Sequence, residues 1–201
     1  MKTLILIDVQ NDFIPGGSLA VPEGDQIIEP INNMLPKFDL VVATQDWHPA
    51  NHKSFASNHP GKKEFEITQL QGMEQTLWPD HCVQKTRGAQ FHPNLETGPI
   101  EAIFHKGMDP EIDSYSGFYD NGHKKSTGLA GYLEEKKAKE VYFCGLAADI
   151  CVYYSILDAL KLGIKAYLIE DASRPLDKEG FEVLKKELRE KGCTILNSTD
   201  L

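Results

Sequence analysis

The stretch EVYFCGLAADICVY, residues 140–153, decides the fold of this chain. It begins with apolar β-forming residues, passes through Gly145, and enters a helical pattern near Asp149 that carries Cys151 in its first turn. Free N–H groups and the dipole at a helix N-terminus favour an anion, so we expect the thiolate of Cys151 to be favoured. The N–H groups of Ala147 and Cys151 could also bind an oxyanion. The alternative is a structural thiol, because free cysteine is usually buried.

Outward from this stretch, buried strands alternate with helices. Short apolar runs predict strands at 3–8, 40–45, 100–105, 165–169 and 193–196. Helices are expected at about 25–35, at about 127–137 with Ser126 as N-cap, from 149 to Gly163, and at 177–191 closed by Gly192. This alternation predicts an α/β fold, a parallel sheet with helices on both faces, and such sheets bind ligands at the carboxyl ends of their strands.

Length and charge limit the class of protein. The 201 residues suit a single domain, residues 1–201, and the segment at about 46–99 is a loop-rich insertion with little periodicity. The formal charge of -9 argues against nucleic acid and against an anionic membrane as partners. A small molecule remains as the expected partner, and the sequence does not decide whether the chain forms a homo-oligomer.

The N-terminal apolar run and the cysteines indicate in which cellular compartment the protein is found. The opening MKTLILIDVQ has a short apolar run that stops at Asp8, which is typical of neither a signal peptide nor a membrane span. The four cysteines form no CxxC pair. We therefore expect a reduced, cytoplasmic protein without disulfides.

Four reactive residues follow four separate strands of the expected sheet. They are Asp8, Asp46, Lys106 and Cys151. Each alone could be a solvated loop residue, but parallel strands bring all four to one edge. There, Asp8 can take the proton of Cys151, and Lys106 can supply the positive charge that keeps both ionised.

A second group of residues suggests a metal site. Asp46 and His48 follow one strand, and His81 can complete a set of three ligands, with His52 nearby. Mixed nitrogen and oxygen ligands suit zinc, iron or manganese. The alternative is that these histidines are ordinary surface residues.

With these residues in view, the chain resembles the nicotinamidase/pyrazinamidase family of the isochorismatase-like cysteine hydrolases over essentially its whole length. The resemblance is carried by DVQNDF (8–13), QDWHPANHKSFAS (45–57), WPDHCV (78–83), HKGMDPEIDSYSGF (105–118) and CGLAADICV (144–152). It implies a three-layer α-β-α fold with a six-stranded parallel sheet of the Rossmann-like, doubly wound type.

The resemblance also implies roles for individual residues. The catalytic residues would be Asp8, Lys106 and Cys151, and the metal ligands Asp46, His48 and His81, with His52 either a fourth ligand or the neighbour of a metal-bound water. The substrate ring would lie between Phe13 and Trp78, with Leu146 and Tyr115 also at the substrate site. Leu146 and Ala147 match a pair joined by a cis peptide bond in relatives.

The implied activity is metal-assisted hydrolysis of nicotinamide to nicotinate and ammonia through a nicotinoyl thioester, in NAD salvage, extending to pyrazinamide. The ion is expected to be zinc, with iron or manganese as alternatives. A related amidohydrolase or isochorismatase that needs no metal and acts on a non-pyridine substrate is the rival enzyme. A silent binding protein on the same fold is the rival outside catalysis, since fold alone does not fix function.

Overall fold

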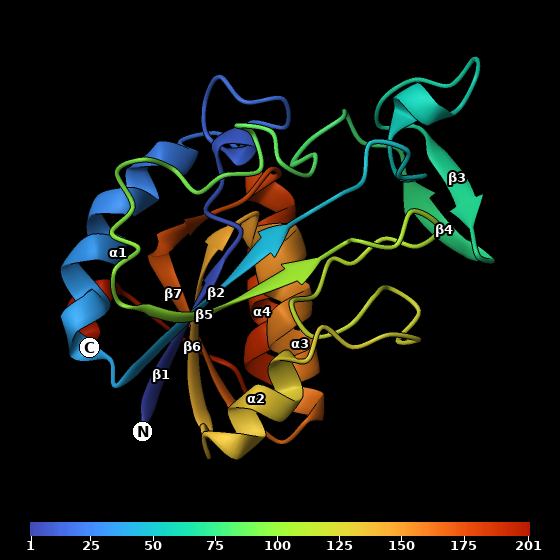
Figure 1. Ribbon diagram of the computed structural model, residues 1–201. Helices are drawn as coiled ribbons and strands as arrows, with labels where there is room; N and C mark the ends of the chain where they lie inside the picture. Colours follow the sequence, from blue (N-terminus) through green and yellow to red (C-terminus); the bar gives the residue numbers. More distant parts are fainter.

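The computed structural model describes residues 1–201 and is built around a six-stranded parallel sheet (Figure 1). The strand order is β5-β2-β1-β6-β7-β8, and every neighbouring pair is parallel. This is the doubly wound order, in which the winding direction reverses between β1 and β6, and the expected fold class is confirmed. The strands span β1 Lys2–Ile7, β2 Leu40–Asp46, β5 Ile100–Lys106, β6 Glu140–Leu146, β7 Lys165–Arg174 and β8 Thr194–Leu196.

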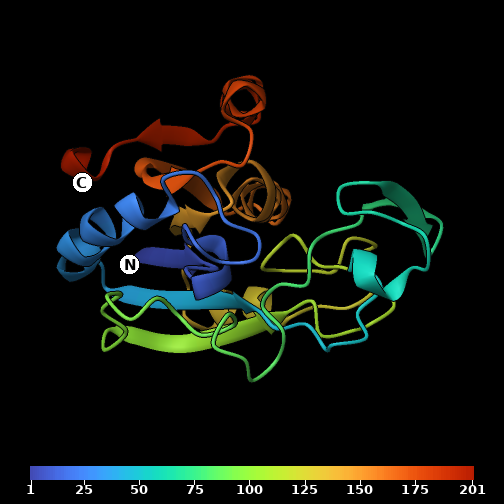
Figure 2. The ribbon, with the colours of Figure 1, turned by 90° about the horizontal axis from the view of Figure 1, so that it is seen from above.

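Helices cover both faces of the sheet, which gives three layers. Helix α1, Ile28–Met34, lies on one face, and α2 Leu129–Glu135, α3 Tyr153–Lys161 and α4 Lys178–Glu190 lie on the other (Figures 1 and 2). Alternate strand residues feed the two cores: Leu4 and Leu6 of β1 pack on the α1 side, whereas Ile5 and Ile7 pack on the opposite side. Burial on both faces explains why the strands are continuous apolar runs. No helix is long and apolar enough to span a bilayer.

Two expected helices begin later than the sequence pattern indicates. The segment expected at 25–35 starts as a 3-10 turn, Gly24–Ile27, before α1. Pro30 lacks the N–H that an α-helix would need to bond the carbonyl of Gln26. The prediction of Ser126 as N-cap is wrong, because the N-cap of α2 is Gly128, with a φ of 94°, and Ser126 Oγ instead accepts the Gly128 N–H.

The segment before β5 contains a hairpin that the sequence analysis missed. Strands β3 Ile67–Leu70 and β4 Met73–Thr76 pair antiparallel and lie apart from the main sheet, at the upper right of Figure 1. Gln71 and Gly72 both have positive φ, as a two-residue hairpin turn requires. The glycine was the available signal, but the flanking residues are mostly polar and hide the strand pattern. Strand β7 also exceeds its expected span of 165–169, because the pairing continues to Arg174 after an irregularity.

Candidate active site

Lys106 is the centre of the candidate site. It ends β5, directly beside Asp46 at the end of β2, and it is 1% exposed. Its Nζ lies 2.9 Å from Asp8 Oδ2, and it donates to Asp46 Oδ1 at 2.5 Å, to the Ser114 carbonyl at 3.0 Å and to Cys151 Sγ at 3.4 Å. Burial lowers the pKa of Lys106, but the two carboxylates raise it well above its ordinary value. Lys106 is therefore a permanent cation that joins an acid to a thiol.

Asp8 follows β1 and turns into the site. Its φ of 50° lies in the left-handed region, which aspartate tolerates better than most residues. Thr44 of β2 donates its hydroxyl hydrogen to Asp8 Oδ1 at 2.6 Å, whereas Oδ2 faces Lys106. Burial raises the pKa of Asp8 above its ordinary value, although Lys106 and the Thr44 hydroxyl both lower it. An acid with a raised pKa suits both taking and returning a proton.

Cys151 lies in a π-helical turn, Ala148–Val152, between β6 and α3. The peptide bond between Leu146 and Ala147 is cis, as the resemblance implies. The thiol is 6% exposed, and burial raises its pKa well above the ordinary value despite the opposing effect of Lys106. The expectation of a favoured thiolate is therefore wrong for the resting site, because desolvation outweighs the helix terminus. Cys151 is a thiol until a base removes its proton.

Three side chains converge on one point next to the cluster of Lys106, Asp8 and Cys151. His48 Nε2 and His81 Nε2 lie 3.6 Å and 3.7 Å from Asp46 Oδ2, and all three residues are buried. The Nδ1 atoms donate to the carbonyls of Gly107 and Pro79, each at 2.8 Å, which leaves both Nε2 lone pairs free to face Asp46. His48 Nε2 has no hydrogen-bond partner. Two imidazole nitrogens and one carboxylate oxygen, oriented in this way, fit a divalent transition metal.

His52 is arranged differently. Its Nδ1 accepts the Ser54 N–H at 3.1 Å and lies 2.7 Å from Ser54 Oγ, which places the ring hydrogen on Nε2. This Nε2 is buried without a partner, close to His48 and to the carboxylate of Asp113. Burial lowers the pKa of His52 to about 4, so the ring is neutral. The geometry favours a donor beside the ligand set over a fourth ligand.

A hydrogen bond joins the DVQNDF loop to the WPDHCV loop, so that His81 faces Phe13. Asp12 Oδ2 accepts the Cys82 N–H at 2.8 Å, and the rings of Phe13 and His81 lie 5.5 Å apart. A Cβ at Gly88 would lie 1.9 Å from the same Asp12 oxygen, so glycine is required there by close packing. The hydrogen bond between Asp12 and Cys82 holds the DVQNDF and WPDHCV segments side by side.

A hollow opens above Cys151. Phe13 and Trp78 form part of its wall and Tyr115 lies beside Trp78, as expected for the substrate site. Leu146 does not line the hollow, because its side chain is fully buried in the core. The lining residues are Phe13, Leu19, Asp46, Trp78, His81, Asp113, Tyr115, Ala147, Ile150, Cys151 and Leu176. The hollow suits a flat, mostly apolar ring with its reactive group at Cys151.

Several residues of the site escaped the sequence analysis. Gln75, delivered by the missed hairpin, donates to Asp113 Oδ2 at 3.0 Å and to the Tyr115 hydroxyl at 3.1 Å. Asp113, 3% exposed, lies within the HKGMDPEIDSYSGF motif, where no single acidic residue stands out. Leu19 and Leu176 carry no signal, because a single leucine in a loop is common.

Known proteins have the same fold and similar sequences. Residues 2–200 match the model of the isochorismatase domain. The nicotinamidase of Escherichia coli (strain K12) is 49% identical over 177 residues, which cover 86% of this chain and 83% of the relative. A solved nicotinamidase and pyrazinamidase of Acinetobacter baumanii has a TM-score of 0.96 at 46% identity, over 99% of this chain and 97% of that one. A pyrazinamidase of Pyrococcus horikoshii, solved in complex with zinc, has a TM-score of 0.81 at 38% identity over 98% of each chain.

The domain match over nearly the whole chain defines the class, and this protein belongs to the isochorismatase family. Within that family it belongs with the nicotinamidases, because its relatives of that name are identical at up to half of the aligned positions.

Proposed function

We propose that this protein hydrolyses nicotinamide to nicotinate and ammonia. The contact of Lys106 with both Asp8 and Cys151, beneath an aromatic hollow, supports this function most directly. The similarity to nicotinamidases supports the choice of substrate.

The first step forms a thioester. The pyridine ring enters between Phe13 and Trp78, which brings the carboxamide carbon to Cys151 Sγ. Asp8 takes the thiol proton as the sulfur attacks, and Lys106 stabilises the sulfur anion during the transfer. The N–H groups of Ala147 and Cys151 then bind the oxyanion.

The second step releases both products. Asp8 returns its proton to the nitrogen of the leaving group, which departs as ammonia and leaves a nicotinoyl thioester on Cys151. Asp8, ionised again, removes a proton from a water molecule that attacks the thioester carbon. The sulfur recovers a proton from Asp8, and the product leaves as nicotinic acid, which gives its remaining proton to solvent and becomes nicotinate.

We further propose that Asp46, His48 and His81 hold one divalent transition metal, with His52 donating from beside them. Zinc is the first candidate, because a similar pyrazinamidase is solved in complex with zinc, and iron or manganese are the alternatives. When bound, such an ion supplies a Lewis acid that accepts the lone pair of the ring nitrogen. Asp46 links the two parts of the site, since Oδ1 accepts from Lys106 and Oδ2 faces the histidines.

The proposed activity predicts a second substrate, a metabolic role and a cellular compartment. Pyrazinamide has the same carboxamide and a ring nitrogen in the same relative position, so we expect it to be a second substrate. Nicotinate would return to pyridine nucleotide synthesis, which places the reaction in NAD salvage. All four cysteines are free, which agrees with a reducing compartment such as the cytoplasm.

The test is an ammonia-release assay with nicotinamide, paired with metal analysis of the purified protein. Wild type should release ammonia and nicotinate in equal amounts, and Cys151→Ala should lose activity by at least ~10³-fold while remaining folded. Cys193→Ala, which removes a buried thiol of the C-terminal edge, should keep the wild-type rate. Wild-type turnover by Cys151→Ala would show that the nucleophile is misassigned. An inactive wild type that binds no metal would favour the metal-free amidohydrolase.

A further inference from the structure

The segment that joins β7 to α4 forms one wall of the hollow. It runs from Arg174 to Asp177, and its Leu176 lines the hollow beside Ala147, Ile150 and Cys151. Leu176 is partly buried and packs against the core cluster on the α1 side of the sheet. The segment therefore supplies apolar surface where the substrate ring is expected.

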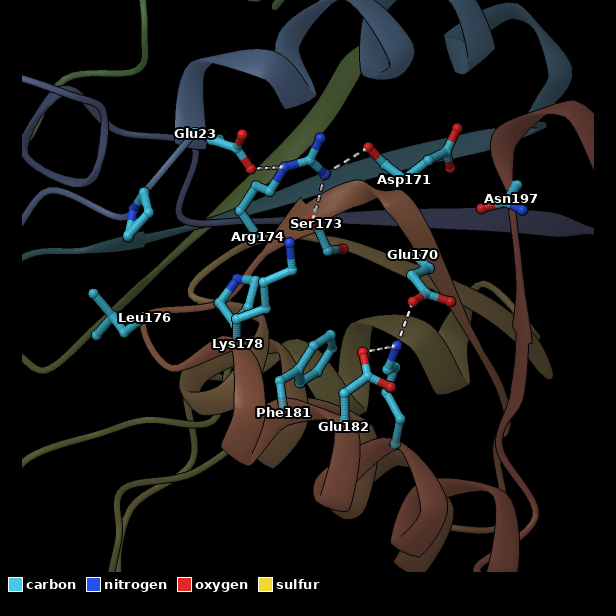
Figure 3. A pocket seen from close by; sticks show the side chains of 13 residues that line it. Glu23, Glu170, Asp171, Ser173, Arg174, Leu176, Lys178, Phe181, Glu182 and Asn197 are labelled. Atoms are coloured by element: carbon cyan, nitrogen blue, oxygen red, sulfur yellow. Dashed lines mark hydrogen bonds and ion pairs between the residues drawn. The ribbon is translucent and has the colours of Figure 1, made fainter.

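Behind this wall the structure is open. A cleft lies between β7 and α4, and its lining is mostly charged and polar (Figure 3). Leu176 lies at the edge of this cleft as well, so the same short segment separates the two spaces (Figure 3). Specific hydrogen bonds hold the Leu176–Asp177 part of the segment in place.

One carboxylate provides these bonds. Asp149 Oδ1 accepts the Leu176 N–H at 3.0 Å, and Oδ2 accepts the Asp177 N–H at 2.8 Å. These two N–H groups have no other acceptor, and Pro175 between the strand end and Leu176 has no N–H to offer. Asp149 thus satisfies both donors of the connecting segment.

The turn that carries Asp149 is fixed independently of this tether. The N–H groups of Ile150 and Val152 both donate to the Ala147 carbonyl, and Cys151 is held by Lys106. Loss of the Asp149 carboxylate would therefore free the connecting segment while leaving the nucleophile in place.

We propose that Asp149 is a positioning residue that holds Leu176 against the ring of the substrate. This inference rests on the proposed hydrolysis of nicotinamide. Because Leu176 offers only apolar contact, its displacement weakens substrate binding in the ground state and transition state alike, so it raises KM and leaves kcat nearly unchanged.

A double-mutant cycle tests the proposal. Asp149→Ala should raise KM for nicotinamide by ~10-fold and change kcat by less than ~2-fold, and Leu176→Ala should do the same. Since Asp149 acts through Leu176, the double variant should have the KM of Leu176→Ala alone. Asp149→Asn keeps one acceptor oxygen and should raise KM less.

Asp171→Ala is the matched control. Asp171 also accepts two hydrogen bonds from a distant segment, from the N–H and hydroxyl of Ser198 at 2.7 Å and 2.6 Å, but it does not line the hollow. This variant should lose comparable stability in urea unfolding and keep the wild-type KM.

Either of two KM results would overturn the proposal. One is a KM that stays at the wild-type value in folded Asp149→Ala, and the other is KM increases that multiply in the double variant. A fall in kcat at constant KM would instead show that Asp149 acts on the Cys151 turn, which also contradicts the proposal.

Amide hydrogen exchange separates this inference from the proposed function. Exchange at Leu176 and Asp177 should become faster in Asp149→Ala, and this needs no turnover. Faster exchange in a protein that does not hydrolyse nicotinamide would refute the proposed function but support the role of Asp149 in holding the segment. Unchanged exchange would refute the tether, whatever the activity.

Discussion

The ammonium nitrogen of Lys106 lies 3.4 Å from the sulfur of Cys151 and donates a hydrogen bond to it. The same nitrogen lies 2.9 Å from Asp8, so one cation contacts both partners of the proposed proton transfer. Burial nevertheless keeps the pKa of Cys151 well above its ordinary value. The thiolate therefore forms only when Asp8 accepts the proton, and the charge that stabilises it is already in place.

Replacing Lys106 by Met should destabilise the protein by ~3–5 kcal/mol at neutral pH, because two buried carboxylates lose their cation. Burial already raises the folded-state pKa of Asp8 above its ordinary value, and without Lys106 it rises further. Stability is then lost as pH rises through the pKa values of Asp8 in the unfolded and folded states, so the variant should gain stability on acidification. Urea unfolding of metal-free protein at several pH values measures this, and a variant that loses stability toward acid would contradict it.

Thr44→Val should move the acid limb of kcat/KM to higher pH. The Thr44 hydroxyl lowers the pKa of Asp8, and a hydrogen bond to a charged group is worth on the order of 1.5–3 kcal/mol. Since the base must be ionised in the free enzyme, a higher pKa shifts the loss of activity upward in pH. Thr3→Val is the control, because Thr3 Oγ1 is buried without a partner. An unchanged profile for Thr44→Val would exclude Asp8 as the titrating base.

His81→Ala and His52→Ala should differ in metal content. His81 presents a free Nε2 lone pair, whereas Nε2 of His52 carries the ring hydrogen. Elemental analysis should find the metal lost from His81→Ala. His52→Ala should still bind one ion per chain at saturation, with an affinity ~10–100-fold weaker. Loss of the ion from both variants at saturation would make His52 a ligand.

Gln75→Leu should lower the free energy of unfolding by ~1–3 kcal/mol, because Asp113 loses a buried hydrogen-bond donor. Since Asp113 and Tyr115 line the hollow, KM for nicotinamide should rise as well. Gln69→Leu changes an exposed position of the same hairpin and should leave both quantities unchanged. Equal behaviour of the two variants would show that the hairpin has no part in the site.

The sequence predicted the parts of the site that follow buried strands. Asp8, Asp46 and Lys106 each end or follow an apolar run, and parallel pairing alone brings such residues to one edge. Cys151 was found by the same logic, but its ionisation was predicted wrongly. Depth of burial depends on packing from many segments, and no local pattern records it.

Other features depended on contacts between distant loops. The tautomer of His52 is set by Ser54, and the orientation of Asp113 by Gln75 from a hairpin of mostly polar residues. The start of α2 at Leu129 depends on Gly128, which competes with Ser126 as a cap and takes the left-handed conformation. Such choices between neighbouring candidates are decided by tertiary structure.

The central place of β1 in the strand order has a consequence for synthesis. Strand β1 is synthesised before the other strands of the sheet, but one of its two neighbours is β6, whose residues follow more than a hundred positions later. A nascent chain that ends before β6 leaves one edge of β1 exposed and has no nucleophile. Contacts between segments that are far apart in the sequence slow folding. Premature termination yields an inert fragment that is prone to aggregate.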